Sequence, residues 1–246
     1  MRIALLSDVH ANAEALSACL SHANEHGADR FVFLGDLVGY GADPGKVLDI
    51  VVRHTLAGAI AVKGNHDEAI AKSAGYFNDA AQAALELARQ SLSAEHKRFL
   101  VELPLVHREG ANCYVHASAA MPERWIYIDS PTAAKRCVEA AQATYTFCGH
   151  VHDQVLYFEN PSGHMCEFRP TPGTPVPMRS HRRWLAIVGS VGQPRDRNPK
   201  AAYALFDRSL EQVTFHRVAY DASAAADAIR RSGLPESLAY RVEAGI

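Results

Sequence analysis

The first quarter of the chain alternates between short apolar runs and amphipathic stretches. Apolar runs of strand length occur at residues 2–7, 30–34 and 59–62. The intervals between them have helical spacing: apolar residues recur at i, i+3, i+4 and i+7 from Leu16, and a second helix is expected to start near Asp43. This strand–helix–strand–helix–strand order predicts a parallel sheet with right-handed crossovers.

The rest of the chain changes from a helical to a β pattern. Helices are predicted at 78–102 (with a break near Ser91), 132–143 and 222–231, the last being the closing element. Short apolar runs predict strands at 105–107, 112–116, 145–148, 155–158, 165–168, 184–188, 201–206 and 213–218. The segment 169–183, rich in proline and arginine, is expected to be an extended surface loop. We predict a single domain over residues 1–246.

The composition is that of an ordinary globular protein, with 48% hydrophobic residues and 25 Lys and Arg against 27 Asp and Glu. These values exclude a disordered or collagen-like chain. The net charge of −2 argues against a protein that binds nucleic acid or an anionic membrane, so neither partner is expected.

Cysteine use and the N-terminus bear on the compartment. The five cysteines are odd in number and no two are spaced CxxC, so neither a disulfide framework nor a zinc ribbon is expected. We expect buried thiols in a reducing environment. The first apolar run ends at Asp8, too early for a signal peptide or a membrane span, and we expect a cytoplasmic protein.

Polar side chains with metal-binding chemistry follow five of the predicted strands, each where its strand ends. They are Asp8 and His10; Asp36; Asn65, His66 and Asp67; His116; and His150 and His152. Because the carboxyl ends of strands in an open α/β sheet line one crevice, we expect these side chains to meet. Five of the 13 histidines of the chain therefore belong to one place.

These residue types suit a pair of metal ions. Carboxylate, amide and imidazole groups are ligands for Mn, Fe, Zn, Co or Ni, and the set is too large for one ion. A carboxylate such as that of Asp36 is able to bridge two ions, and such pairs bind phosphate and lower the pKa of a bridging water. An extended segment would point His150 and His152 the same way.

The ordered motifs DxH, GDLVGYG, GNHD, VH and GHxH resemble those of the calcineurin-like metallophosphoesterase superfamily, and most of all its small bacterial phosphodiesterase-like branch. The resemblance covers nearly the whole chain, including the GSVGQPRD segment at 189–196. It implies an α/β fold with two mixed β-sheets in a sandwich flanked by helices, a four-layer arrangement with the site at the sandwich edge. It also implies a metal-dependent hydrolase of phosphoric esters, a phosphodiesterase or phosphatase with a binuclear metal centre.

The resemblance assigns the ligands residue by residue. One ion would be held by Asp8, His10, Asp36 and His152. The other would be held by Asp36, Asn65, His116 and His150. A small phosphomonoester or phosphodiester would then be attacked by a metal-bridging hydroxide, with Mn, Fe, Zn, Ni or Co as the two divalent ions.

For two residues of the GNHD motif the resemblance implies a role in catalysis rather than in metal binding. His66 would stand near the leaving group as an acid or an electrostatic stabiliser. Asp67 would orient His66, although a plain salt-bridge role for Asp67 remains open.

Three positions depart from the family pattern. Gly39-Tyr40-Gly41 stands where the protein-phosphatase branch has Asp-Arg-Gly, so the phosphate-clamping arginine is absent and that activity is in doubt. Ala11 and Ala117 replace glycines that commonly follow the metal-binding residues. Neither alanine removes a ligand.

Substrate contacts are candidates with alternatives. Asn12 is either a substrate contact or the N-cap of the first helix. Arg195 suits phosphate through its bidentate fork, but an ion pair with Asp196 explains it equally. Tyr40 either covers the substrate or packs, and the same choice applies to Trp125 and Tyr127.

Two other functions remain open at this stage: a scaffold with a vestigial site, and a nuclease, which the charge and the length disfavour. The histidines outside the motifs carry no assigned role and are expected on the surface or on helices. They are His22, His26, His54, His96, His107, His164, His181 and His216.

Overall fold

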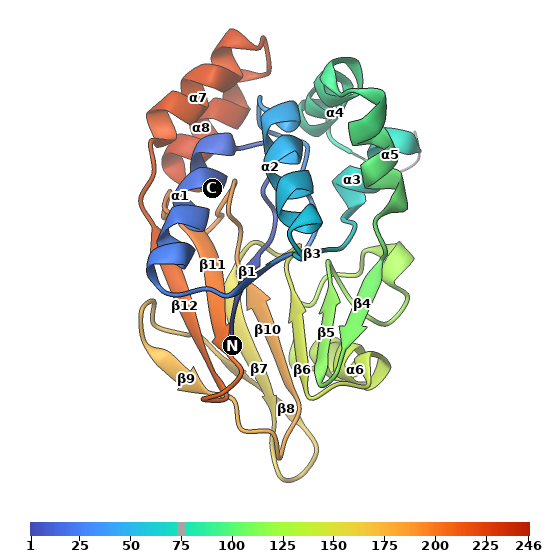
Figure 1. Cartoon of the computed structure of the whole chain (residues 1–246), viewed down its shortest axis with the longest axis vertical. Coiled ribbons are helices and arrows are strands. Elements are labelled where there is room, and N and C mark those ends of the chain that lie inside the picture. The colour runs from blue at the N-terminus through green and yellow to red at the C-terminus, as the bar shows by residue number, and fades with distance from the viewer. Residues whose placement is uncertain (73–76) are drawn as a thin grey trace.

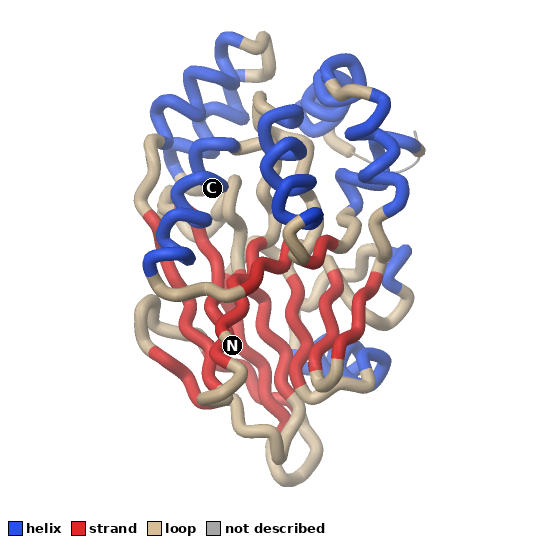
Figure 2. The backbone as a smooth tube through the Cα atoms, in the orientation of Figure 1, coloured by secondary structure: helices blue, strands red, loops and turns tan. Residues whose placement is uncertain are grey.

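The computed structural model describes residues 1–72 and 77–246. Two six-stranded sheets lie face to face and helices cover their outer faces, as Figures 1 and 2 show. This is the α/β sandwich expected from the sequence.

The first sheet carries the N-terminal strands at one end. Its strand order is β3 (Ile60–Ala61), β2 (Arg30–Phe33), β1 (Arg2–Leu6), β11 (Ala201–Asp207), β12 (Gln212–Val218) and β9 (Pro175–Pro177). Strands β1, β2 and β3 are parallel, as predicted, whereas β11 pairs antiparallel with β1. The sheet is therefore mixed, because the chain returns to the middle of it after building the second sheet.

The second sheet is built from the middle of the chain. Its order is β4 (Val106–Glu109), β5 (Asn112–Val115), β6 (Tyr145–Cys148), β10 (Trp184–Val188), β7 (Gln154–Glu159) and β8 (Met165–Phe168). Strands β5, β6 and β10 are parallel, and the outer pairs are antiparallel. The carboxyl ends of β5 and β6 thus face the same edge of the sandwich.

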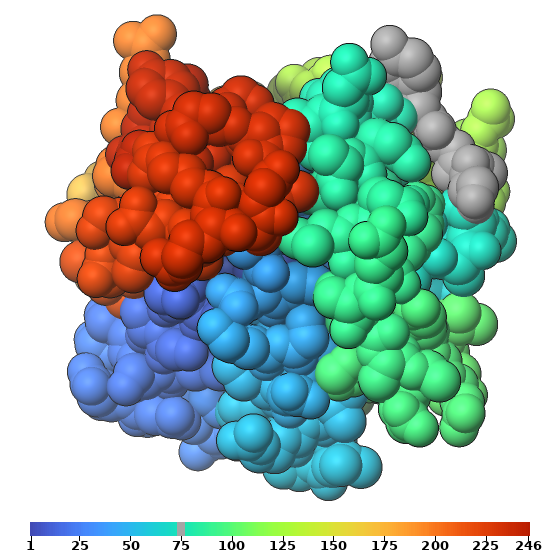
Figure 3. Space-filling view, turned by 90° about the horizontal axis from the view of Figure 1, so that it is seen from above, coloured from blue at the N-terminus to red at the C-terminus, as the bar shows by residue number. Residues whose placement is uncertain are grey.

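Helices lie over the first sheet and around its edge, and one helix covers the second sheet. The first group is α1 (Ala13–Glu25), α2 (Pro44–Leu56), α3 (Asn65–Ala71), α4 (Asp79–Ser91), α5 (Ala94–Glu102), α7 (Ala222–Arg231) and α8 (Glu236–Ala244). Helix α6 (Pro131–Ala141) packs on the second sheet, and a 3-10 turn spans Pro122–Arg124. Seen from above, α7 and α8 lie beside α4 (Figure 3), and apolar side chains of all three form one cluster.

Side-chain caps explain several helix starts. Asn12 and Asn78 accept hydrogen bonds from the first turns of α1 and α4. Ser93 caps α5 in the same way, which confirms the predicted break between α4 and α5. Each cap satisfies an amide that would otherwise lack a partner at the helix end.

The core has one apolar layer between each pair of structural layers. The layer between the sheets contains large side chains from both, among them Leu5, Phe147 and Phe206.

Four of the five cysteines are buried and all are free thiols, as expected. Over the described residues, no helix has the length and apolarity that crossing a membrane requires.

Three elements differ from the prediction. Residues 175–177 form β9 on the edge of the first sheet, inside the segment expected to be a loop, since proline is tolerated at an edge. Helix α3, which was not predicted, begins at Asn65, so the GNHD motif forms the N-cap and first turn of a helix. Helix α7 is not the closing element, because α8 follows it.

Candidate metal centre and phosphate site

The predicted residues meet at the edge of the sandwich. The segments after β1, β2 and β3 approach those after β5 and β6, and the Asp and His side chains among them are buried. Three overlapping groups of potential ligands result, each with donor atoms within 4.8 Å of one another. The expected crevice is therefore present.

One group joins Asp8, His10 and His152. The Asp8 carboxylate accepts the backbone N–H of His150 with Oδ2 at 2.9 Å, and its buried Oδ1 has no hydrogen-bond partner. That Oδ1 lies 3.3 Å from the Nε2 of His152 and 3.9 Å from the Nε2 of His10. Asp8 thus anchors one loop with one oxygen and presents the other to two imidazoles.

The second group joins Asp36, His116 and His150. Asp36 accepts the backbone N–H of His66 with Oδ1 at 2.9 Å. Its Oδ2 lies 3.3 Å from the Nε2 of His116 and 3.8 Å from the Nε2 of His10. One oxygen of Asp36 therefore lies between the two groups, which is the position that a bridging ligand needs.

Backbone carbonyls fix the tautomers of three rings. The Nδ1 atoms of His10, His116 and His152 lie 3.2, 2.7 and 2.6 Å from the carbonyl oxygens of Val38, Leu34 and Gln193. A carbonyl only accepts, so each Nδ1 carries the proton. Each Nε2 then faces the centre of the site, the outer hydrogen-bonding pattern typical of metal-binding histidines.

The facing nitrogens fit a bound cation. The Nε2 atoms of His10 and His152 are 3.2 Å apart, although burial lowers the pKa of both rings well below the usual value and leaves them neutral. Two neutral rings in these tautomers point lone pairs at each other. The Nε2 of His116 and the Nδ1 of His150 are 3.1 Å apart, and the buried Oδ1 of Asn65 has no partner. This donor set suits borderline divalent ions.

Burial also shifts the pKa of the Asp8 carboxyl and of a third imidazole, His150. Desolvation raises the pKa of Asp8 to about 6, partly opposed by His116. Burial likewise lowers the pKa of His150 to about 3, with His116 adding to the effect. Positive charge supplied at this position would favour the ionised carboxylate and the neutral imidazole that ligand binding requires.

The backbone is strained where it presents these residues. Asp8, His10, Asp36, His150 and His152 all have left-handed backbone, with φ between 48° and 70°. Non-glycine residues adopt this region at a cost, and such residues concentrate at functional sites. The prediction that His150 and His152 lie on an extended segment is wrong, because both sit in left-handed turns.

Two glycines allow the loops to approach each other. A Cβ on Gly64 would lie near the Asp36 carboxylate and its backbone nitrogen, and a Cβ on Gly149 would collide with Ser7 and Asp8. Both positions require glycine, because any side chain would collide with backbone or buried groups that cannot move away.

His66 and Asp67 occupy different environments. His66 is 3% exposed, lines the cavity over the site, and has no hydrogen-bond partner at Nδ1. Asp67 accepts the backbone N–H groups of Leu37, Val38 and Gly64. The predicted orientation of His66 by Asp67 is therefore wrong: no hydrogen bond joins them in the described structure, because three amides occupy the carboxylate.

The site opens into a cavity of about 340 Å³. Tyr40 and Arg195, both predicted contacts, line it; Tyr40 also packs edge-on against His10 at 4.7 Å. Arg195 does not pair with Asp196, which pairs with Arg217 instead. The buried Nε of Arg195 has no hydrogen-bond partner.

Further cavity residues come from distant segments: Tyr127, already a candidate from the sequence, and Arg241 and Phe77, which were not. Arg241 on α8 lies over the Tyr40 ring, with its guanidinium 5.7 Å from the ring centre, and the Arg195 guanidinium lies 5.8 Å from the same ring. Phe77 and Tyr127 add aromatic walls, and Tyr127 stacks on His150 at 4.1 Å. The sequence analysis missed Arg241 and Phe77, because neither belongs to a motif and only the packing of the helices brings them here.

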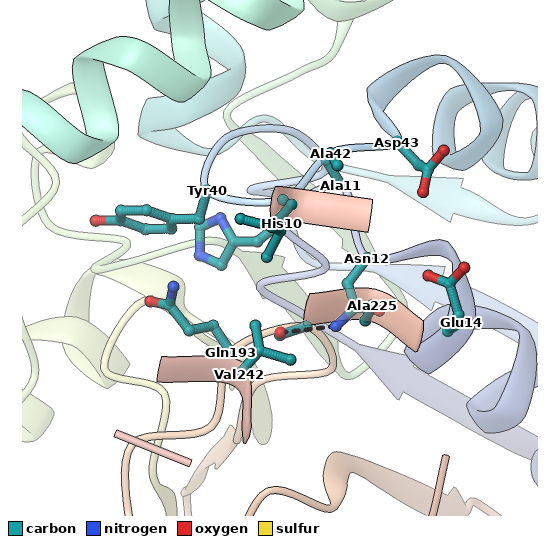
Figure 4. Close-up of a pocket in the computed structure, with 13 residues that line it drawn as sticks. His10, Ala11, Asn12, Glu14, Tyr40, Ala42, Asp43, Gln193, Ala225 and Val242 are labelled. Carbon is teal, nitrogen blue, oxygen red and sulfur yellow. Dashed lines mark hydrogen bonds between the residues drawn. The ribbon is translucent and has the colours of Figure 1, made fainter. Parts of the chain in front are cut away.

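Asn12 belongs to a smaller, mostly apolar cavity beside His10 (Figure 4). Its Oδ1 accepts the N–H of Ala15, and its Nδ2 donates to the carbonyl of Gly192 and to the hydroxyl of Tyr220. The N-cap alternative is confirmed, and no Asn12 atom lines the larger cavity.

Comparison with known proteins agrees with this geometry. The family described as the calcineurin-like phosphoesterase superfamily domain matches residues 1–210. The solved structure of a metallophosphoesterase from Sphaerobacter thermophilus is similar over 100% of this chain and 99% of its own, with a TM-score of 0.90 and 37% identity. The two-sheet sandwich with buried Asp and His groups at its edge thus matches the architecture of metallophosphoesterase structures.

The chain belongs to the calcineurin-like phosphoesterase superfamily. It is also 30% identical over 249 residues to MJ0912, an uncharacterized protein of Methanocaldococcus jannaschii, covering 99% of this chain and 98% of that protein. The hypothetical protein PH1004 of Pyrococcus horikoshii has the same fold, with a TM-score of 0.80 at 20% identity over 100% of this chain and 98% of its own.

Proposed function

We propose that this protein hydrolyses phosphoester bonds of a small phosphomonoester or phosphodiester with two divalent metal ions. The observation that carries the proposal is the pair of neutral imidazoles, His10 and His152, whose lone pairs face each other at 3.2 Å beside an unpartnered carboxylate oxygen of Asp8. Without a cation this arrangement is unfavourable. The cavity above it admits a small substrate.

The ligands divide into two sets that share one carboxylate. One ion would be held by Asp8, His10, Asp36 and His152. The other would be held by Asp36, Asn65, His116 and His150. The Oδ2 of Asp36 supports this division, because it lies within 3.8 Å of the Nε2 of His10 and 3.3 Å of that of His116.

When bound, the two ions would supply a water of lowered pKa and positive charge for the phosphate oxygens. The protein contributes orientation and charge. Arg195 and Arg241 line the same cavity and present guanidinium groups suited to phosphate. They supply positive charge in a chain that lacks the phosphate-clamping arginine at Tyr40.

His66 is proposed to donate its ring N–H to the leaving oxygen, as an acid or an electrostatic stabiliser. It lines the cavity, and no protein group competes for its Nδ1. Burial lowers its pKa, so the ring is neutral before the substrate binds. A neutral imidazole still has one N–H to donate. Asp67 acts indirectly, by holding the loops that carry Asp36 and Asn65.

The test is hydrolysis of a generic diester and a generic monoester, bis(p-nitrophenyl) phosphate and p-nitrophenyl phosphate, by the protein reconstituted with Mn²⁺. We expect turnover of at least one of them. His66→Ala should retain two metal equivalents and lose about 10²–10⁴-fold in kcat, the usual contribution of an acid catalyst. Asp36→Asn should lose bound metal.

Elemental analysis separates the failures. Two bound metals with no turnover of either ester would overturn the proposal and favour a scaffold on the same fold. Unchanged turnover in His66→Ala would refute the role of that residue alone. His181→Ala changes an exposed histidine that does not line the cavity; it serves as the matched control and should behave as the parent protein.

A further inference from the structure

A second group of histidines lies away from the site just described. His22 and His26 stand one helical turn apart in the last turn of α1 and at its C-cap, and His216 lies on β12. Helix α1 packs on β11 and β12, as Figure 1 shows, and this contact brings the three rings together. His22 is about 15 Å along α1 from the end that adjoins His10, at about 1.5 Å per residue.

The three rings have the geometry of a ligand cluster. Each ring offers one nitrogen, and these three nitrogens all lie within 4.8 Å of one another. The ring centres of His22 and His26 are 4.0 Å apart, and each is 5.0 or 5.2 Å from that of His216. Imidazoles four residues apart on a helix share a face, which lets both bind one ion.

His216 gives an independent indication of a ligand. It is 9% exposed, and its buried Nε2 has no hydrogen-bond partner. Buried polar atoms without a partner are rare, and each costs free energy. The sequence analysis expected this histidine on the surface or on a helix, which is wrong: β12 places it inside, facing α1.

Neighbouring hydrogen bonds orient the other two rings. The Nδ1 of His26 lies 2.7 Å from the carbonyl oxygen of His22 and so carries a proton, leaving a lone pair on Nε2. The Nδ1 of His22 lies 2.8 Å from the hydroxyl of Tyr203, which fixes that ring in turn. These are the outer contacts that orient metal-binding histidines elsewhere.

Charge also favours a cation here. The last carbonyl groups of α1 give this end of the helix a partial negative charge, which attracts positive ions. Burial lowers the pKa of His216 to about 4, so this ring does not itself supply positive charge at neutral pH. Among the described residues the group itself is three histidines without a carboxylate ligand, and hard ions such as Mn²⁺ or Mg²⁺ prefer carboxylate oxygens.

We propose that His22, His26 and His216 form a separate site for one borderline divalent ion, Zn²⁺, Ni²⁺ or Cu²⁺, that ties the end of α1 to β12. Three imidazoles with one open position match the ligand number of a four-coordinate zinc ion. The bound ion would stabilise the native protein by its binding free energy, because the three residues are far apart in the unfolded chain.

The test is the number of Zn²⁺ ions bound per chain after equilibrium dialysis, measured by elemental analysis. The double variant His22→Ala/His26→Ala should bind one ion fewer than the parent protein, and the matched control His181→Ala should bind the same number. The difference between proteins is the readout, so the result does not depend on how many ions the phosphate site holds. Equal numbers in parent and double variant would overturn the proposal.

A second variant guards against a loss of folding. His26→Ala removes an exposed C-cap side chain, so the fold should persist, and the thermal midpoint in EDTA checks this. Its Zn²⁺ affinity at this site should fall by about 100-fold or more, beyond what the loss of an outer hydrogen bond costs. An electron paramagnetic resonance spectrum of one added Cu²⁺ should show coupling to three imidazole nitrogens in the parent protein; a spectrum without them would contradict the site.

Discussion

Asp67 offers the sharpest test of how the loops of the phosphate site are held. Its carboxylate receives the N–H groups of Leu37 and Gly64 at 2.9 Å each and that of Val38 at 3.3 Å. Two of these amides directly follow Asp36 on one loop, and the third directly precedes Asn65 on the other. Asp67→Asn keeps the size of the side chain but replaces one accepting oxygen with a donor.

The structure sets the size of the effect. At least one hydrogen bond to a charged acceptor is lost, worth about 1.5–3 kcal/mol. Burial, helped by the Asp36 charge, raises the pKa of Asp67 to about 7, so the charged and neutral forms are about equally populated at pH 7 and the lower half of that range applies. A loss of about 2 kcal/mol should lower the melting temperature by roughly 4–8 °C in a chain of this size.

The assay is thermal unfolding in EDTA, followed by turnover at rising Mn²⁺ concentration. Asp67→Asn should melt lower and need more Mn²⁺ for half-maximal turnover, yet approach the parent kcat at saturation. Asp79→Asn, an exposed carboxylate in the first turn of α4, is the control and should change the melting temperature little. An unchanged melting temperature with reduced kcat at saturating Mn²⁺ would refute the reasoning and restore Asp67 as a group that acts through His66.

Three further changes have defined outcomes. Gly64→Ala should abolish metal binding measured by elemental analysis, because the added Cβ would overlap the Asp36 carboxylate. The control is Gly45→Ala, which should retain metal binding because a Cβ there meets no other atom. Arg183 lowers the pKa of Glu159 to about 2, so Glu159→Gln should cost about 1 kcal/mol at pH 7 in denaturant titrations. Because the shift is downward, that difference should shrink below pH 4.5 and vanish near pH 2; a constant difference would contradict the ion pair. Arg241→Ala should lower kcat/KM by about 10–100-fold, the value of one hydrogen bond to a charged phosphate, and an unchanged value would remove Arg241 from the substrate site.

Much of the fold follows from local patterns. The strands at 145–148, 165–168 and 184–188 have the bounds predicted from their apolar runs, because each is bounded by turn residues. Helix α8 and strand β9 were not predicted. The apolar face of α8 is weak and is buried by packing against α7, which the sequence pattern does not reveal. Strand β9 is a proline-rich edge strand that pairs with β12.

The phosphate site shows the same division between local and tertiary information. Ligand candidates were found because they follow strand ends, where topology alone brings them together. Arg241 and Phe77 were not found, since only the packing of the helices brings them to the site. The left-handed backbone at His150 and His152 also escaped prediction, because residues other than glycine adopt it only where surrounding contacts impose it.

Anomalous scattering from a crystal of the Mn²⁺-loaded protein tests the central claim most directly. The account predicts two peaks on either side of the Asp36 carboxylate, one against Asp8 and His152 and the other against His116 and Asn65, about 3.5–4 Å apart as in other two-metal sites. A single peak, or two peaks that do not share Asp36, would contradict it.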